Sequence, residues 1–73
     1  MDEDDVVEQI REGMELRGIK TERRLASLSG MSLRHIQKVM RGSSKPGPVT
    51  LKNVAEALGC HWVGETLKTG RVG

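Results

Sequence analysis

Three side chains with hydrogen-bonding ends recur at helical spacing in the middle of the chain: Arg34, Gln37 and Lys38. Residues three and four positions apart share one face of a helix, so these ends would lie side by side. A guanidinium can bond to two acceptors of guanine, a carboxamide pairs with adenine, and an ammonium bonds to guanine or phosphate. The residue types therefore indicate recognition of nucleic-acid bases. An ordinary solvated helix face is the alternative interpretation of each.

The other side of the same segment is apolar, which predicts a helix over residues 33–41. Ile36, Val39 and Met40 recur at the spacing of a buried helical stripe. Ser32 directly precedes the segment and has the side chain that an N-cap needs. Burying the stripe would direct the three polar ends outward.

A second short helix, residues 22–29, precedes this one with almost no linker between them. Thr21 is its expected N-cap. Gly30 is expected to end it, because glycine adopts the left-handed backbone of a tight turn at no steric cost. Two helices joined in this way over residues 22–41 form a helix-turn-helix, which presents its second helix to the major groove of DNA.

Further apolar periodicity predicts helices on both sides of this motif. The expected helices are residues 5–17, capped by Asp5, and residues 51–58, capped by Thr50. A short fifth helix is expected near residues 62–68. No strand-like alternation is visible, so we expect an all-α fold, a compact four- to five-helix bundle.

The composition limits the number of domains and the kinds of chemistry. A length of 73 residues predicts one domain, which we place at residues 5–68 between an acidic tail, 1–4, and a flexible tail, 69–73. One cysteine, Cys60, and two histidines are too few for a disulfide or a structural zinc site. No carboxylate pair, nucleophile–base set or phosphate-cradling glycine loop is recognisable. We therefore expect neither an enzyme nor a metal or cofactor.

Charge is distributed unevenly along the chain. Residues 1–10 contain five acidic residues and no basic one, whereas residues 11–45 contain nine Lys or Arg against three Glu. The basic middle section points to an anionic partner, with nucleic acid as the first candidate.

The sequence also predicts where the protein resides. No apolar run approaches the roughly 20 residues that span a membrane. The acidic first residues are the opposite of a signal or transit peptide. Together with the single cysteine, these features lead us to expect a cytoplasmic protein.

The run LASLSGMSLRHIQKVMRG and the later VTLKNVAEALG resemble the lambda-repressor-like, Xre/Cro family of bacterial and phage DNA-binding domains. The resemblance covers about residues 7–62 and extends well beyond the two helices of the motif. The matching positions are Leu25, Ala26, Gly30, Ser32, Ile36, Val39, Gly42, Pro46, Pro48, Leu51, Ala55 and residues 57–59.

The resemblance implies which side chains contact DNA. Base contacts are implied for Leu33, Arg34, Gln37 and Lys38, and Leu33 would contact a thymine methyl group. Phosphate contacts are expected at both ends of the second helix, in the loop after it and at the start of the first helix. The expected phosphate-contacting residues are Ser32, Arg41, Ser43, Ser44, Lys45, Arg23 and Arg24.

These features favour a sequence-specific double-stranded-DNA-binding transcription regulator, a repressor that acts as a homodimer on a two-fold operator. One recognition helix reads few base pairs, so two half-sites about one helical turn apart would be needed. The expected dimer surface contains Trp62, Val63 and Leu67, with core filling as the other role for Trp62. One alternative is an antitoxin that also binds a toxin protein, through the acidic N-terminus. Another is a protein-interaction module that does not bind DNA.

Overall fold

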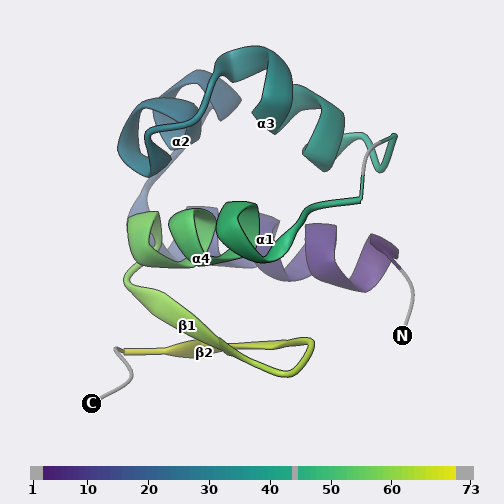
Figure 1. The fold of residues 1–73 in the computed structure, drawn as a ribbon. Helices are drawn as coiled ribbons and strands as arrows, with labels where there is room; N and C mark the ends of the chain where they lie inside the picture. Colours follow the sequence, from purple (N-terminus) through teal and green to yellow (C-terminus); the bar gives the residue numbers. More distant parts are fainter. Residues whose placement is uncertain (1–2, 44, 71–73) are drawn as a thin grey trace.

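The described residues form four helices followed by a two-stranded antiparallel sheet. The computed structural model describes residues 3–43 and 45–70, with side chains from residue 6 onward. Figure 1 shows α2 and α3 on one side of α4 and the two strands on the other, with α1 behind α4. The elements are α1 (Glu3–Arg17), α2 (Glu22–Ser29), α3 (Leu33–Met40), α4 (Pro48–Ala57), β1 (Cys60–Val63) and β2 (Thr66–Thr69).

The apolar stripes of the helices meet in one core. The largest fully buried side chains come from all four helices and from the residue that follows α4. Burying a side chain of this size contributes about 1.5–3 kcal/mol relative to leaving it in water. The core therefore holds α2 and α3 in place from below and leaves their outer faces to solvent. These largest buried side chains are Ile10, Leu25, Ile36, Val39, Val54 and Leu58.

The turn between α2 and α3 is tight because Gly30 adopts a left-handed conformation, with φ 71° and ψ 19°. Its N–H donates to the carbonyl of Ser27 at 3.3 Å, and the N–H of Met31 donates to the carbonyl of Ala26 at 3.0 Å. This pair of bonds is the Schellman motif, which satisfies the last carbonyls of a helix while reversing the chain. The predicted helix-turn-helix over residues 22–41 is thus present in the structure.

The start of α4 differs from the expectation that Thr50 caps a helix over residues 51–58. The helix begins at Pro48, and Gly47 is its N-cap, without a side-chain bond. Proline suits the first helical position, because the N–H that it lacks has no partner within the helix there. Thr50 consequently lies inside the helix, where its side chain is buried. The first helix also begins earlier than expected, at Glu3, so Asp5 is not its N-cap.

The expected fifth helix near residues 62–68 is wrong, and so the fold is not purely helical. This segment is a hairpin in which Cys60 pairs with Thr69 and Val63 pairs with Thr66. The register leaves two residues in the turn, and the first of them, Gly64, has a φ of +62°. Glycine at the first of two turn residues is a hairpin signal, and the flanking aromatic and β-branched residues favour strands over a helix.

Hydrogen bonds of Trp62 and Gln9 help to attach the hairpin to the helices. The indole Nε1 of Trp62 donates to the carbonyl of Leu51 in α4 at 2.8 Å. From α1, the Nε2 of Gln9 donates to the carbonyl of Glu65 at 2.8 Å. The Oε1 of Gln9 accepts from the N–H of Leu67 at 2.7 Å. Both ends of one carboxamide are therefore used to hold the hairpin turn.

Replacing Gly30 tests the left-handed turn. No atom lies within 4 Å of the position that a Cβ would occupy there, so the effect of a side chain is confined to the backbone conformation. We expect Gly30→Ala to lower the free energy of unfolding by about 1–2 kcal/mol, and Gly30→Asn to lower it less, because asparagine tolerates this conformation. Urea unfolding of the three proteins measures the difference. Equal stability of the alanine variant and the wild type would contradict the assignment.

Replacing Gln9 with Glu tests the attachment of the hairpin. The ionised carboxylate keeps the acceptor for Leu67 but places a second acceptor against the carbonyl of Glu65. We expect the free energy of unfolding to fall by about 1–3 kcal/mol at pH 7. Below about pH 4 the protonated carboxyl can donate again, so part of the deficit relative to wild type should disappear. Glu8→Gln, at the exposed neighbouring position, serves as the matched control in urea unfolding at both pH values.

Candidate nucleic-acid interface

The outer face of α3 presents two extended cations to solvent. Arg34 and Lys38 are both exposed, and Gln37 between them is half-buried. Neither cation has a hydrogen-bond or ion-pair partner among the described side chains. Their ends are therefore available for an external acceptor, at the helical spacing that the sequence predicted.

Leu33 lies at the edge of this face and is not fully outward. Its side chain is half-buried and packs against the core. The part that remains accessible is apolar and lies at the first position of α3. Of the four positions expected to contact bases, two are thus exposed and two are partly engaged with the protein.

A hydrogen bond that the sequence analysis did not predict joins α3 to α4. The Nε2 of His35 lies 3.0 Å from the Oγ1 of Thr50, in the first turn of α4. Thr50 is buried and His35 is half-buried, so water competes little for this bond. Pro48 was the residue in the sequence that could have indicated this bond. A helix that begins at Pro48 contains Thr50 as a helical residue, so Thr50 is not its N-cap.

A hydroxyl group stands at the start of each helix of the motif. The Oγ of Ser32 accepts from the N–H of His35 at 3.2 Å, and the Oγ1 of Thr21 accepts from the N–H of Arg24 at 3.1 Å. Both caps use the oxygen as an acceptor and leave the O–H hydrogen unused. Each exposed hydroxyl can therefore donate to an anion while it caps its helix.

The loop after α3 holds residues with different capacities. Both donors of Ser43, its N–H and its hydroxyl, bond to the carbonyl of Lys38, at 3.1 and 3.2 Å. This serine closes α3 and has no donor left in this conformation. Ser44 lies outside the described residues. Lys45 is exposed, and so is Arg41, the C-cap of α3.

The helix-turn-helix and the following loop expose a surplus of cations, which we call the basic surface. Its cations are all exposed, whereas the acidic residue of the segment, Glu22, is half-buried at the start of α2. Such a surplus of positive charge attracts the phosphate backbone of nucleic acid. The six cations are Arg23, Arg24, Arg34, Lys38, Arg41 and Lys45.

The residues expected at a dimer surface lie in different surroundings. Trp62 is half-buried against the core and bonded to α4. Leu67 is half-buried against the core, on the strand that contacts α1. Val63 is 55% exposed at the end of β1.

The part of the chain that the structure describes shows neither a metal-binding cluster nor a membrane-spanning helix. There, no three His, Cys, Asp or Glu side chains are grouped so that they could hold a metal ion. The described helices also include none with the length and apolar character needed to cross a membrane.

Comparison with known proteins supports what the geometry indicates. A family model described as helix-turn-helix matches residues 10–63, about three quarters of the chain. No curated protein and no solved structure gives a significant match. The matched segment runs from the middle of α1 to the end of β1 and includes all of α2, α3 and α4. The chain belongs to the helix-turn-helix family of the lambda-repressor-like, Xre/Cro type, whose members are DNA-binding regulatory domains.

Proposed function

We propose that this protein is a sequence-specific transcription regulator that binds double-stranded DNA as a homodimer and represses by occupying a two-fold operator. The observation that carries the proposal is the outer face of α3. Its cations Arg34 and Lys38 are exposed and have no partner among the described residues, on a helix held by the Gly30 turn and the His35–Thr50 bond.

In this proposal α3 lies in the major groove and reads base edges. Arg34 bonds to the O6 and N7 of guanine, and Lys38, one turn later, bonds to a second guanine or to phosphate. Gln37 uses the exposed part of its carboxamide on adenine. Leu33 contacts a thymine methyl group with the part of its side chain that the core leaves accessible.

Phosphate contacts set the position of the protein on the duplex. The hydroxyls of Ser32 and Thr21 donate from the starts of α3 and α2, where the helix dipoles also favour an anion. Exposed Arg23, Arg24, Arg41 and Lys45 add charge. Ser43 contributes only if its hydroxyl exchanges its bond to Lys38 for a phosphate, and Ser44 is retained from sequence reasoning alone.

Two copies are needed because one α3 helix reads few base pairs. A homodimer presents two such helices to half-sites about one helical turn apart, which multiplies specificity. Repression follows from occupancy alone, whereas activation requires a further contact with the transcription machinery. We therefore favour a repressor and assign no catalytic role.

A second protein partner is the alternative with an observation in its favour. Glu8, Glu12 and Glu15 are exposed along α1. An antitoxin would use such an acidic surface to bind a basic toxin while α3 binds DNA. Copurification of a toxin encoded beside this gene, in a complex that Glu-to-Gln changes in α1 weaken, would favour this alternative.

Selection of bound sites from random duplexes tests the proposal as a whole. We expect a half-site of a few base pairs, repeated in inverted orientation, and binding that weakens steeply as salt rises. If no duplex binds in a salt-sensitive manner, the proposed function fails.

Comparing Arg34→Ala with Lys45→Ala separates base reading from phosphate contact. We expect Arg34→Ala to weaken binding to the selected site by about 1–3 kcal/mol and to relax the preference at one base pair. Lys45→Ala should weaken binding to selected and scrambled duplexes about equally and reduce the salt slope by roughly one. Fluorescence anisotropy on both duplexes, at several salt concentrations, measures these effects. The assignment is wrong if the two variants behave alike.

Replacing Thr50 tests whether the His35 bond positions α3. Thr50→Val keeps the shape but removes the hydroxyl, so we expect binding to the selected duplex to weaken by about 1 kcal/mol, roughly fivefold. Binding to scrambled duplex should change little, because the phosphate-contacting cations remain. Thr50→Ser retains the hydroxyl and should preserve the ratio between the two affinities. An unchanged ratio in a folded valine variant would show that the bond is structural only.

A further inference from the structure

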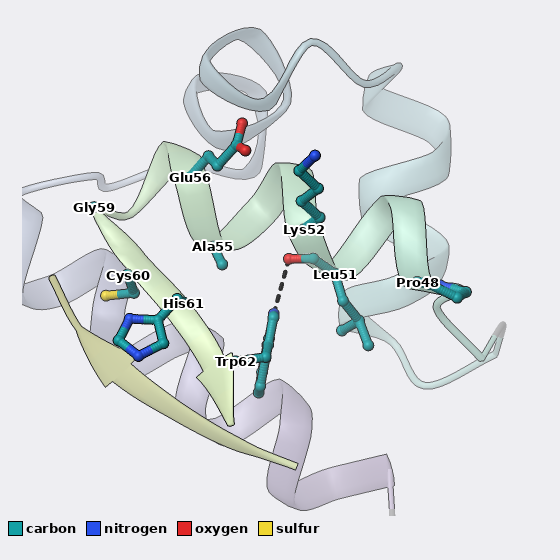
Figure 2. Close-up of a pocket in the computed structure, with 9 residues that line it drawn as sticks. All are labelled: Pro48, Leu51, Lys52, Ala55, Glu56, Gly59, Cys60, His61 and Trp62. Carbon is teal, nitrogen blue, oxygen red and sulfur yellow. Dashed lines mark hydrogen bonds between the residues drawn. The ribbon is translucent and has the colours of Figure 1, made fainter. Parts of the chain in front are cut away.

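A groove lies between α4 and β1, away from the basic surface. Its volume is about 780 Å³. Figure 2 shows Leu51 and Trp62 facing each other across it, joined by the bond from the indole to the Leu51 carbonyl, with Pro48 at one end. Each wall therefore contributes one large, half-exposed apolar side chain, and a hydrogen bond joins the two walls.

Two opposite charges border the groove on the α4 side. Lys52 and Glu56 are one helical turn apart, and both are exposed. Figure 2 shows both side chains extending from α4 away from the hairpin. Among the described side chains neither has an ion-pair or hydrogen-bond partner.

These groups all belong to one face of α4. Pro48, Leu51 and Ala55 follow one another at three- and four-residue spacing, and Lys52 and Glu56 form a parallel row beside them. Because Ala55 is buried, the accessible part of this face consists of Pro48 and Leu51 next to a row with one cation and one anion. A surface of this kind is complementary to itself after a two-fold rotation, because rotation brings each cation opposite the anion of the other copy.

We propose that the groove between α4 and β1 is the homodimer contact, occupied by the same face of a second copy. The two α4 helices run antiparallel across the two-fold axis. Lys52 of each copy then pairs with Glu56 of the other, and Leu51 and Trp62 of both copies form the apolar centre. The proposal rests on the homodimer of the proposed function and names its surface.

The position of the groove suits a dimer that binds DNA. Its lining residues come from α4, β1 and the residue that joins them, and none comes from α2 or α3. A second copy in the groove therefore leaves the cations of α3 uncovered. Of the three residues expected from sequence at a dimer surface, Trp62 lines this groove, whereas Val63 and Leu67 do not.

Charge reversal tests the proposal with the full chain. In Lys52→Glu every intermolecular pair becomes two anions, and in Glu56→Lys it becomes two cations. Each single reversal should raise the dimer dissociation constant at least about tenfold, since like charges then face each other in place of opposite ones. The double reversal restores opposite charges and should return the constant to within about threefold of wild type. An equimolar mixture of the two single variants should form heterodimers.

Sedimentation over a wide concentration range measures these constants, and circular dichroism confirms that each variant is folded. Glu15→Lys makes the same change at an exposed position of α1 outside the groove, and it should leave the dimer unchanged. The proposal is overturned if the double reversal fails to rescue the singles, if Glu15→Lys dissociates the dimer equally, or if wild type stays monomeric at every concentration.

Measuring DNA binding by the same variants distinguishes failure of the proposed dimer contact from failure of the proposed DNA-binding function. Binding of each folded variant to a duplex with one selected half-site reports on α3 alone. Lys52→Glu should retain this binding, apart from a loss of affinity that the added negative charge causes for every duplex alike. Retained half-site binding without charge rescue refutes the groove and leaves the DNA function standing. Charge rescue without binding to any duplex refutes the DNA function and leaves the groove standing.

Discussion

The burial of one side of α3 is the constraint on which the rest of the molecule depends. Ile36 and Val39 are each 1% exposed, so the rotation of this helix about its own axis is determined by the core. The Gly30 turn fixes where the helix starts, and the bond from His35 to Thr50 fixes its relation to α4. Apolar packing on the inner face of α3 consequently determines which side chains, among them Arg34 and Lys38, lie on its outer face.

The structure uses α4 as the support for two different surfaces. On one side its Thr50 bonds to α3, and on the other its Leu51 carbonyl accepts from Trp62 of the hairpin. Adjacent residues of one helix thus connect to α3, which we propose binds DNA, and to the groove. A rigid α4 would keep the two surfaces at a constant distance, which a two-fold complex on evenly spaced half-sites requires.

Local signals in the sequence were sufficient for α2 and α3. Their caps Thr21 and Ser32, the apolar stripe of α3 and Gly30 agree with one another, so the predicted and observed bounds of these helices nearly coincide. The same pattern predicted which cations of α3 lie outside. Thr50 was misplaced because threonine is a good cap and its burial depends on a partner fifteen residues earlier in the chain. The hairpin was not predicted because four-residue strands carry little periodicity, and the single turn residue Gly64 does not by itself distinguish a hairpin from an interrupted helix.

The hydrogen bonds between Gln9 in α1 and the hairpin turn join segments that are far apart in the sequence, and this affects the order of folding. Residues 9 and 67 are 58 positions apart in the chain. Closing a loop of that length costs roughly 3–4 kcal/mol of chain entropy, which one carboxamide does not offset. By contrast, α2, the Gly30 turn and α3 are contiguous and can form without distant contacts. The contact between α1 and the hairpin is therefore expected to form after the helix-turn-helix, and its loss would affect β2 without directly disturbing α3.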